Sequence, residues 1–328
     1  MSISSNSAGA GAAAPEEKDA TVTVAGVEIA CRFTLPSGKS EGAVLLLPGS
    51  LYSDVDGNYP SLNMRPHAYA DLARQLGERG FAVLRMAKIG PGTGSRTLDA
   101  SLAARHTEFL TRVVVGSAGL ALLRRTVAAR PVIVAGHSEG AVVASLLAAG
   151  ADRQVIDGVV SLSGPALPIL DILREQVVAM APPGAPSDMT LFDRTIAAIR
   201  AGDSPPADAK RSSQTAMLAT MPIPALAYLR SADRIDPVAA LARVQQPVLI
   251  VQGGRDASVS SGHADMLKDG RGNSLTEAAF FPTLTHFYKI APPDLPPMQS
   301  MGLVSESDPA VADIIAKWSH RVAGTLRE

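Results

Sequence analysis

Short apolar runs that end at turn residues alternate with helix-like segments along most of the chain, and this alternation constrains the fold more than any other feature. The runs are continuous in apolar residues, which is typical of strands buried on both faces of a parallel sheet. Strands and helices in alternation predict a doubly wound α/β fold. The six runs are Ala43–Leu47, Phe81–Met86, Val132–Ala135, Val159–Leu162, Val248–Val251 and Ala278–Phe281.

Helix-like patterns lie between several of these runs, and a further helix is expected at the end of the chain. Asp308 can cap that last helix and Pro309 fits its first turn, so it should run to about Ala323. Before the sheet, two β-like runs joined by Ala25-Gly26 predict a hairpin. The hairpin runs are Thr21–Val24 and Val27–Leu35, and the internal helices are Ala68–Gly77, Thr107–Ala129, Glu139–Ala149 and Gly262–Leu267.

One long segment interrupts the alternation of strands and helices. About 85 residues between Leu162 and Val248 contain many prolines and no clear strand. A structureless loop of that length is rare in a compact domain, and helical patterns lie between the prolines. We therefore predict that residues 165–240 form a helical lid inserted into an α/β core made of residues 21–164 and 241–328. The helical patterns are Leu167–Met180, Met189–Ala201 and Ser212–Thr220.

The first 20 residues are rich in small and polar side chains, which predicts a disordered tail. No basic residue precedes Lys18 and no apolar run follows the start, so a secretory signal peptide is not expected. No window reaches the roughly 18 apolar residues of a membrane span. The single cysteine, Cys31, cannot form an internal disulfide, which fits a reducing compartment. We therefore expect a soluble, cytoplasmic protein.

The charge balance restricts the possible partners. Lysine and arginine number 30, aspartate and glutamate 31, and the net charge is −1. Nucleic-acid binding through phosphate neutralisation is therefore not expected, nor is binding to an anionic membrane surface. The oligomeric state cannot be inferred from these features.

The segment Gly136-His137-Ser138-Glu139-Gly140 matches the G-x-S-x-G motif. It directly follows an expected buried strand and opens an apolar helix, which is the setting of a nucleophile elbow. A side chain at either glycine would collide across so tight a turn. The motif predicts Ser138 as a nucleophile, with His137 pointing away from the site.

A serine nucleophile needs a histidine base that is oriented by an acid. In this kind of elbow the chain order is serine, acid, histidine, which His286 fits best because it follows the last strand-like run. Asp256 comes just after Val248–Val251 and is the expected acid. Asp233 and Asp236 compete with it, but Asp236 before a proline is more typical of a turn or a helix cap.

The tetrahedral intermediate of acyl transfer needs backbone amide donors. One should be the N–H of Glu139, the residue after the nucleophile. The second should come from the loop after the first core strand, where Ser50 is the first choice and Leu51 the second. Gly49 in the same loop allows close approach of the backbone.

These features together resemble the α/β-hydrolases of the serine aminopeptidase-like group, which includes monoacylglycerol lipases and many bacterial carboxylesterases. The resemblance covers about residues 40–325 and rests on LLLPGS, GHSEG, PVLIVQGGRD and the Thr285-His286 step. It implies nucleophile Ser138, acid Asp256, base His286 and an oxyanion hole at the PGS loop. The sequence departs where relatives commonly read D-K-R-G, since this chain has Ala87-Lys88-Ile89-Gly90, which puts an inferred salt bridge there in doubt.

We predict a serine hydrolase that cleaves carboxylic esters of small to medium, moderately apolar substrates through an acyl-enzyme. The same machinery could act on thioesters or amides, or transfer the acyl group to an alcohol. A non-catalytic ligand-binding homologue is a more distant alternative. Apolar lid residues are expected to contact the substrate: Ile169, Met180, Met189 and Phe192.

A nucleotide-binding oxidoreductase is a competing class, because three glycines follow an expected strand. Gly90, Gly92 and Gly94 do not complete a dinucleotide fingerprint, since its third glycine would fall on Ser95. No phosphate-loop motif is present, and the histidines are dispersed without a metal-ligand spacing. We therefore expect neither a cofactor nor a metal.

Overall fold

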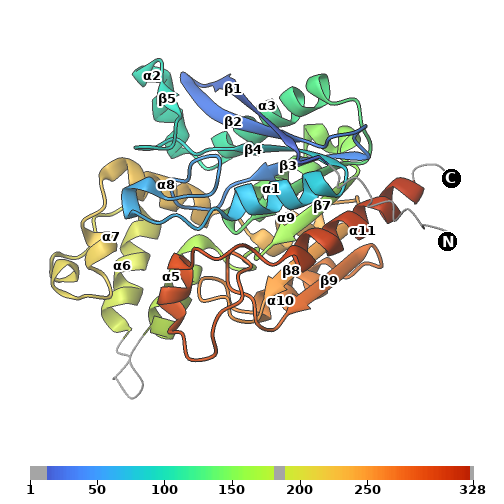
Figure 1. Cartoon of the computed structure of the whole chain (residues 1–328). Coiled ribbons are helices and arrows are strands. Elements are labelled where there is room, and N and C mark those ends of the chain that lie inside the picture. The colour runs from blue at the N-terminus through green and yellow to red at the C-terminus, as the bar shows by residue number, and fades with distance from the viewer. Residues whose placement is uncertain (1–12, 181–188, 326–328) are drawn as a thin grey trace, which may run out of the picture.

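The computed structural model describes residues 13–180 and 189–325, and it is built around one mixed sheet (Figure 1). The strands lie in the order β1-β2-β4-β3-β6-β7-β8-β9, and β5 pairs with β2. Their bounds are β1 Glu16–Val24, β2 Val27–Leu35, β3 Gly42–Leu47, β4 Phe81–Met86, β5 Arg96–Thr97, β6 Val132–His137, β7 Gly158–Leu162, β8 Val248–Gly253 and β9 Thr276–Phe281.

Strands β3, β4, β6, β7, β8 and β9 are parallel, whereas β1 and β2 are antiparallel additions at one edge. Every residue of β3, β4, β6, β7 and β8 is buried, so the continuous apolar runs are explained by burial on both faces. The chain leaves β3 at the centre and later adds strands on both sides of it. This doubly wound arrangement confirms the predicted fold class.

Helices cover both faces of the sheet and form two separate apolar cores. On one face α1 (Ala68–Glu78) packs against α11 (Pro309–Thr325), as Figure 1 shows. On the other face lie α3 (Leu110–Thr126), α4 (Glu139–Ala149), α9 (Pro237–Ala242) and α10 (Gly262–Arg271). A short helix α2 (Ala100–Ala103) precedes α3. The last helix starts as predicted, with Asp308 accepting a hydrogen bond from the amide of Ala310 at 2.9 Å.

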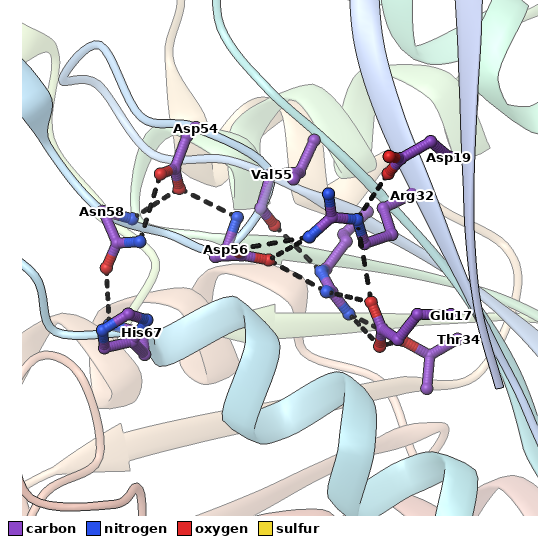
Figure 2. A network of polar contacts seen from close by, with 10 residues as sticks. Glu17, Asp19, Arg32, Thr34, Asp54, Val55, Asp56, Asn58 and His67 are labelled. Atoms are coloured by element: carbon purple, nitrogen blue, oxygen red, sulfur yellow. Dashed lines mark hydrogen bonds and ion pairs between the residues drawn. The ribbon is translucent and has the colours of Figure 1, made fainter. Parts of the chain in front are cut away.

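The predicted N-terminal tail is too long, because β1 already begins at Glu16. Its first residues pair with the end of β2, from Glu16 opposite Leu35 onward. Charge also holds this end of the strand: Arg32 binds Asp19 (Figure 2), and Arg85 binds Glu17. The rest of the predicted tail lies mainly outside the described residues.

Between β7 and α9 the chain forms helices α5 to α8, here called the inserted helices. Their bounds are α5 Ile169–Met180, α6 Thr190–Ala201, α7 Ala216–Ala219 and α8 Ile223–Asp233. They share an apolar cluster of their own, separate from the two cores of the sheet. The predicted segment boundary at residue 240 falls inside α9, which packs on α4 and α10 and therefore belongs to the core. Asp236 caps α9, as expected.

Candidate active site

Ser138 occupies a strained turn between β6 and α4. Its backbone has φ +54° and ψ −124°, outside the regions that most residues adopt. A Cβ at Gly136 would lie 2.0 Å from the carbonyl oxygen of Gly140, and one at Gly140 would lie 2.5 Å from the carbonyl oxygen of Leu47. Only glycine fits at both positions, so the motif forms the sharp strand–turn–helix connection that it predicts.

Asp256 and His286 are in direct contact, although 30 residues separate them in the sequence. His286 Nδ1 lies 2.8 Å from Asp256 Oδ2. The Asp256 side chain is fully buried and that of His286 is 5% exposed. Asp256 follows β8 and His286 lies in the loop after β9, so parallel neighbouring strands deliver both side chains to the same edge of the sheet.

The loop after β8 holds the Asp256 carboxylate in its charged form. Its Oδ1 accepts hydrogen bonds from the amides of Ser258 at 2.8 Å and Val259 at 2.9 Å. Burial alone would raise the pKa of Asp256, but the positive field of His286 and the two amides outweigh burial and lower this pKa. A charged acid beside Nδ1 favours the tautomer in which that nitrogen carries the proton, so Nε2 is left to accept one.

Ser138 and His286 line one cavity of about 830 Å³, together with Glu139, Ser50 and Leu51. The two backbone segments expected at an oxyanion hole, the loop after β3 and the start of α4, therefore meet beside Ser138. Within residues 13–180 and 189–325, no hydrogen bond joins Ser138 to His286; such catalytic contacts often tighten only when substrate binds.

The loop after β3 is placed by a tyrosine that the sequence analysis missed. Tyr69, near the start of α1, accepts a hydrogen bond from the amide of Gly49 at 2.9 Å. A Cβ at Gly49 would lie 3.2 Å from the Cβ of Ser138, so the loop packs against the nucleophile. Because Tyr69 takes up the Gly49 amide, Ser50 and Leu51 remain the candidate donors of this loop.

His137 does not point away from the site but lies beneath His286, with ring centroids 4.4 Å apart. Its Nε2 donates to the carbonyl oxygen of His286 at 2.9 Å, and its Nδ1 accepts from the hydroxyl of Tyr69 at 3.1 Å. Burial and the nearby His286 lower the pKa of His137 to about 3, so its ring is neutral. The sequence carries no local signal for this contact, because Tyr69 is 68 residues away.

The side chain of Glu139, the residue after Ser138, belongs to a buried charge cluster. Its Oε1 accepts from Lys88 Nζ at 2.8 Å and lies 3.3 Å from Arg112 Nε. Arg112 also donates to the Tyr228 hydroxyl and lies over the Tyr228 ring. Burial by itself would raise the pKa of Glu139, but Lys88 and Arg112 lower it to about 2. Burial and the charge of Arg112 lower the pKa of Lys88 to about 7, against the opposing effect of Glu139.

The four predicted lid residues divide into two pairs. Ile169 and Met180 line the cavity. Met189 and Phe192 do not: both are buried among the inserted helices, where Met189 precedes α6 and Phe192 packs in the shared apolar cluster. The prediction of substrate contact is wrong for these two residues, because they face the inserted helices and not the nucleophile.

A second buried histidine, His263, and the competing acid Asp233 have other contacts. His263 accepts a hydrogen bond from the amide of Ala166 at 2.9 Å and contacts Glu175 at 2.7 Å, so it holds α5 against the core. Asp233 accepts from the amide of Leu170 and from Arg200.

Among the described residues, no group of three or more His, Cys, Asp or Glu side chains could hold a metal ion. None of the described helices has the length and apolar character to cross a membrane.

The doubly wound sheet and the strained serine after β6 define an α/β-hydrolase. A family model described as serine aminopeptidase, S33, matches residues 62–288, and the chain belongs to this family.

Several proteins are similar to this chain over most of its length. Esterase EstD of Thermotoga maritima is 25% identical over 305 residues, which cover 92% of this chain and 67% of the relative. Among solved structures, an esterase from Pyrococcus furiosus superposes with a TM-score of 0.56 at 16% identity, covering 93% of this chain and 92% of the other. Est1E of Butyrivibrio proteoclasticus, solved with ferulic acid bound, superposes with a TM-score of 0.55 at 18% identity, covering 91% of this chain and 98% of the other. The two structural matches show the fold alone.

Proposed function

We propose that the protein is a serine carboxylester hydrolase that works through an acyl-enzyme on small to medium, moderately apolar esters. The observation that carries the proposal is the 2.8 Å contact of buried Asp256 with His286, which lines the apolar cavity together with Ser138. Family membership and the esterase activity in the name of the Thermotoga relative support it.

In the acylation step Ser138 Oγ attacks the ester carbon while Nε2 of His286 takes its proton. The carbonyl oxygen becomes an oxyanion, which the amides of Glu139 and Ser50, or Leu51 in its place, would stabilise. Asp256 keeps the imidazole oriented and stabilises its charged form. When the intermediate collapses, the bond to the alcohol breaks and His286 returns the proton to the departing oxygen.

In the deacylation step a water molecule replaces the alcohol. His286 takes a proton from the water as its oxygen bonds to the acyl carbon, and a second oxyanion forms in the same amide site. Collapse breaks the bond to Ser138 Oγ, which recovers its proton from His286. The products are a carboxylic acid and the free enzyme.

The cavity supports an apolar substrate. Its wall combines the loop after β3, the segment that leads into α3 and the inserted helices α5 and α8. The methionines of the wall can adapt to acyl groups of different shapes, because their side chains are unbranched and polarisable. The four methionines are Met180, Met217, Met221 and Met301.

A panel of p-nitrophenyl esters, with a matched thioester and anilide, tests the proposal. We expect turnover of the esters and labelling of the wild-type protein by a fluorophosphonate. Ser138→Ala should abolish the labelling and lower kcat by about 10⁶-fold, the scale on which serine nucleophiles act. No turnover and no labelling of wild-type protein would contradict the proposal.

The base is tested by two histidine variants. His286→Ala should lower kcat nearly as far as Ser138→Ala does, because the two groups act as a unit. His263→Ala is the matched control, since His263 is equally buried but binds Ala166 and Glu175. Equal losses in the two variants would overturn the assignment of His286.

A further inference from the structure

Lys88 is a buried cation that the proposed mechanism does not use. It follows β4, and its side chain is 2% exposed. A buried ammonium is costly unless it has charged and hydrogen-bonding partners. The hydrogen-bond partners of Lys88 therefore indicate its role, and both of them lie in segments beside Ser138.

The ammonium of Lys88 joins the two segments that form the expected oxyanion hole. Its Nζ donates to the carbonyl oxygen of Ser50 at 3.0 Å and to Oε1 of Glu139 at 2.8 Å. Ser50 belongs to the loop after β3 and Glu139 to the first turn of α4. These segments lie about 90 residues apart in the chain, and Lys88 is a direct polar link between their oxyanion-hole residues.

The Ser50 amide lies between two anchored groups. On one side the amide of Gly49 donates to Tyr69 at 2.9 Å. On the other side the carbonyl of Ser50 accepts from Lys88. With both neighbouring groups held, the peptide that carries the Ser50 N–H has little freedom to rotate away from the cavity that Ser50 lines.

We propose that Lys88 is a positioning residue for the oxyanion hole. Its ammonium group bridges the Ser50 carbonyl oxygen and the Glu139 carboxylate, and this bridge keeps the amides of Ser50 and Glu139 at a fixed separation. This inference rests on the proposed function. It assigns a role to a buried lysine that the proposed catalytic steps do not use. Lys88 acts through Ser50 and Glu139 and does not itself touch the substrate.

The charge of the cluster suits this role. Two basic side chains, Lys88 and Arg112, contact the single carboxylate of Glu139. Because Arg112 also contacts Glu139, removal of Lys88 does not leave the buried carboxylate without a cation. A variant at position 88 can therefore lose the anchor of Ser50 and still fold.

The test compares Lys88→Met with the wild type on one p-nitrophenyl ester. We expect kcat to fall by about 10²-fold, the effect of losing one oxyanion donor, while KM changes by less than threefold. A trifluoromethyl ketone provides the second readout, because Ser138 adds to its carbonyl carbon, its oxygen becomes an oxyanion and His286 takes the proton. Its inhibition constant should rise in parallel with the loss in kcat/KM, whereas the affinity for the carboxylic acid product should not change.

Two further variants keep the result interpretable. Lys88→Met combined with Glu139→Gln removes the charge pair as a unit and should show the same fall in kcat if Lys88→Met alone folds poorly. Arg271→Met removes another buried cation, which binds carbonyl oxygens of Val244 and Gln246 far from the nucleophile, and should lower stability without changing kcat.

The inference is overturned if the folded Lys88 variants keep kcat and ketone affinity within twofold of the wild type. It is also overturned if the loss in kcat only follows the loss in stability, as with Arg271→Met. Absence of turnover in the wild type is a different result, since it would contradict the proposed function and not the role of Lys88.

Discussion

At the scale of single residues, one neutral histidine connects two loops of the candidate site. His137 donates to the carbonyl oxygen of His286 and accepts from Tyr69, whose hydroxyl also binds the Gly49 amide. Burial raises the pKa of Tyr69 to about 12, so its hydroxyl keeps the proton that it donates. The loop that should hold the oxyanion and the loop that holds the base are thus connected through two side chains.

The neutral state of His137 has a consequence for stability. In the folded protein its pKa is about 3, whereas an unfolded chain has the ordinary value near 6.5. Between these pH values the unfolded chain binds the extra proton, so the free energy of unfolding falls as pH falls, by up to about 1.4 kcal/mol per pH unit. We expect His137→Gln to reduce this slope, as measured by urea unfolding between pH 4.5 and 6.5.

His320→Gln is the control for the pH experiment. His320 lies on α11 with 47% of its side chain exposed and forms an exposed ion pair with Glu41, so its replacement should change the free energy of unfolding by less than about 1 kcal/mol. If His137→Gln and the wild type have parallel curves of stability against pH, the neutral buried histidine is not the origin of the slope.

At the scale of elements, the hairpin β1–β2 is held to the sheet by ion pairs as well as by the backbone hydrogen bonds between β2 and β4. Arg85 on β4 is 2% exposed and donates to Glu17 at 2.6 and 3.0 Å and to Asp56 at 2.9 Å. Asp56 lies in the loop after β3, and its carbonyl oxygen accepts from the amide of Tyr69 at 3.1 Å. Arg85 therefore connects β1 to the loop that leads to α1.

Glu17→Gln should destabilise this hairpin without affecting catalysis. The buried guanidinium of Arg85 loses one of its two carboxylate partners, and we expect the free energy of unfolding to fall by about 1.5–3 kcal/mol. Glu16→Gln is the matched control on the same strand, since Glu16 forms only an exposed pair with Lys18, and it should change stability by less than about 0.5 kcal/mol. Equal effects of the two variants in urea unfolding would contradict the role of Arg85, and kcat should be unchanged in both.

At the scale of the whole molecule, the substrate cavity lies between the core and the inserted helices. Each methylene that an acyl chain buries there contributes about 0.8 kcal/mol, so kcat/KM should rise about fourfold per methylene from acetate until the cavity is filled. Met180→Asp places a charge on the cavity wall and should lower kcat/KM for octanoate about tenfold while sparing acetate.

Ile223→Asp is the control for the chain-length experiment. Ile223 begins α8 with 80% of its surface exposed, so a charge there should alter neither ester. A p-nitrophenyl series in which acetate is the best substrate would show that the acyl group does not occupy the apolar cavity.

Elements with a local origin could be predicted from the sequence. The buried strands, the elbow at Ser138 and the Asp256 turn depend on neighbours within a few residues, so their patterns are visible in the chain. The start of β1 was missed because Glu16 and Glu17 are polar, and their place in the sheet depends on β2 and β4. Phe192 was misplaced because an apolar helix position does not reveal whether it faces substrate or another helix.

The sequence by itself therefore determined the doubly wound fold and the strained turn at Ser138, and it indicated Asp256 and His286 as neighbours, because strand burial and strand order place the ends of β6, β8 and β9 at one edge. Only the tertiary structure decided how Tyr69, His137 and Lys88 hold the site, and which inserted residues face the cavity. These contacts join segments far apart in the chain, and a side chain's partner across such a distance is selected by packing and by the need to satisfy buried charge, which no local pattern encodes.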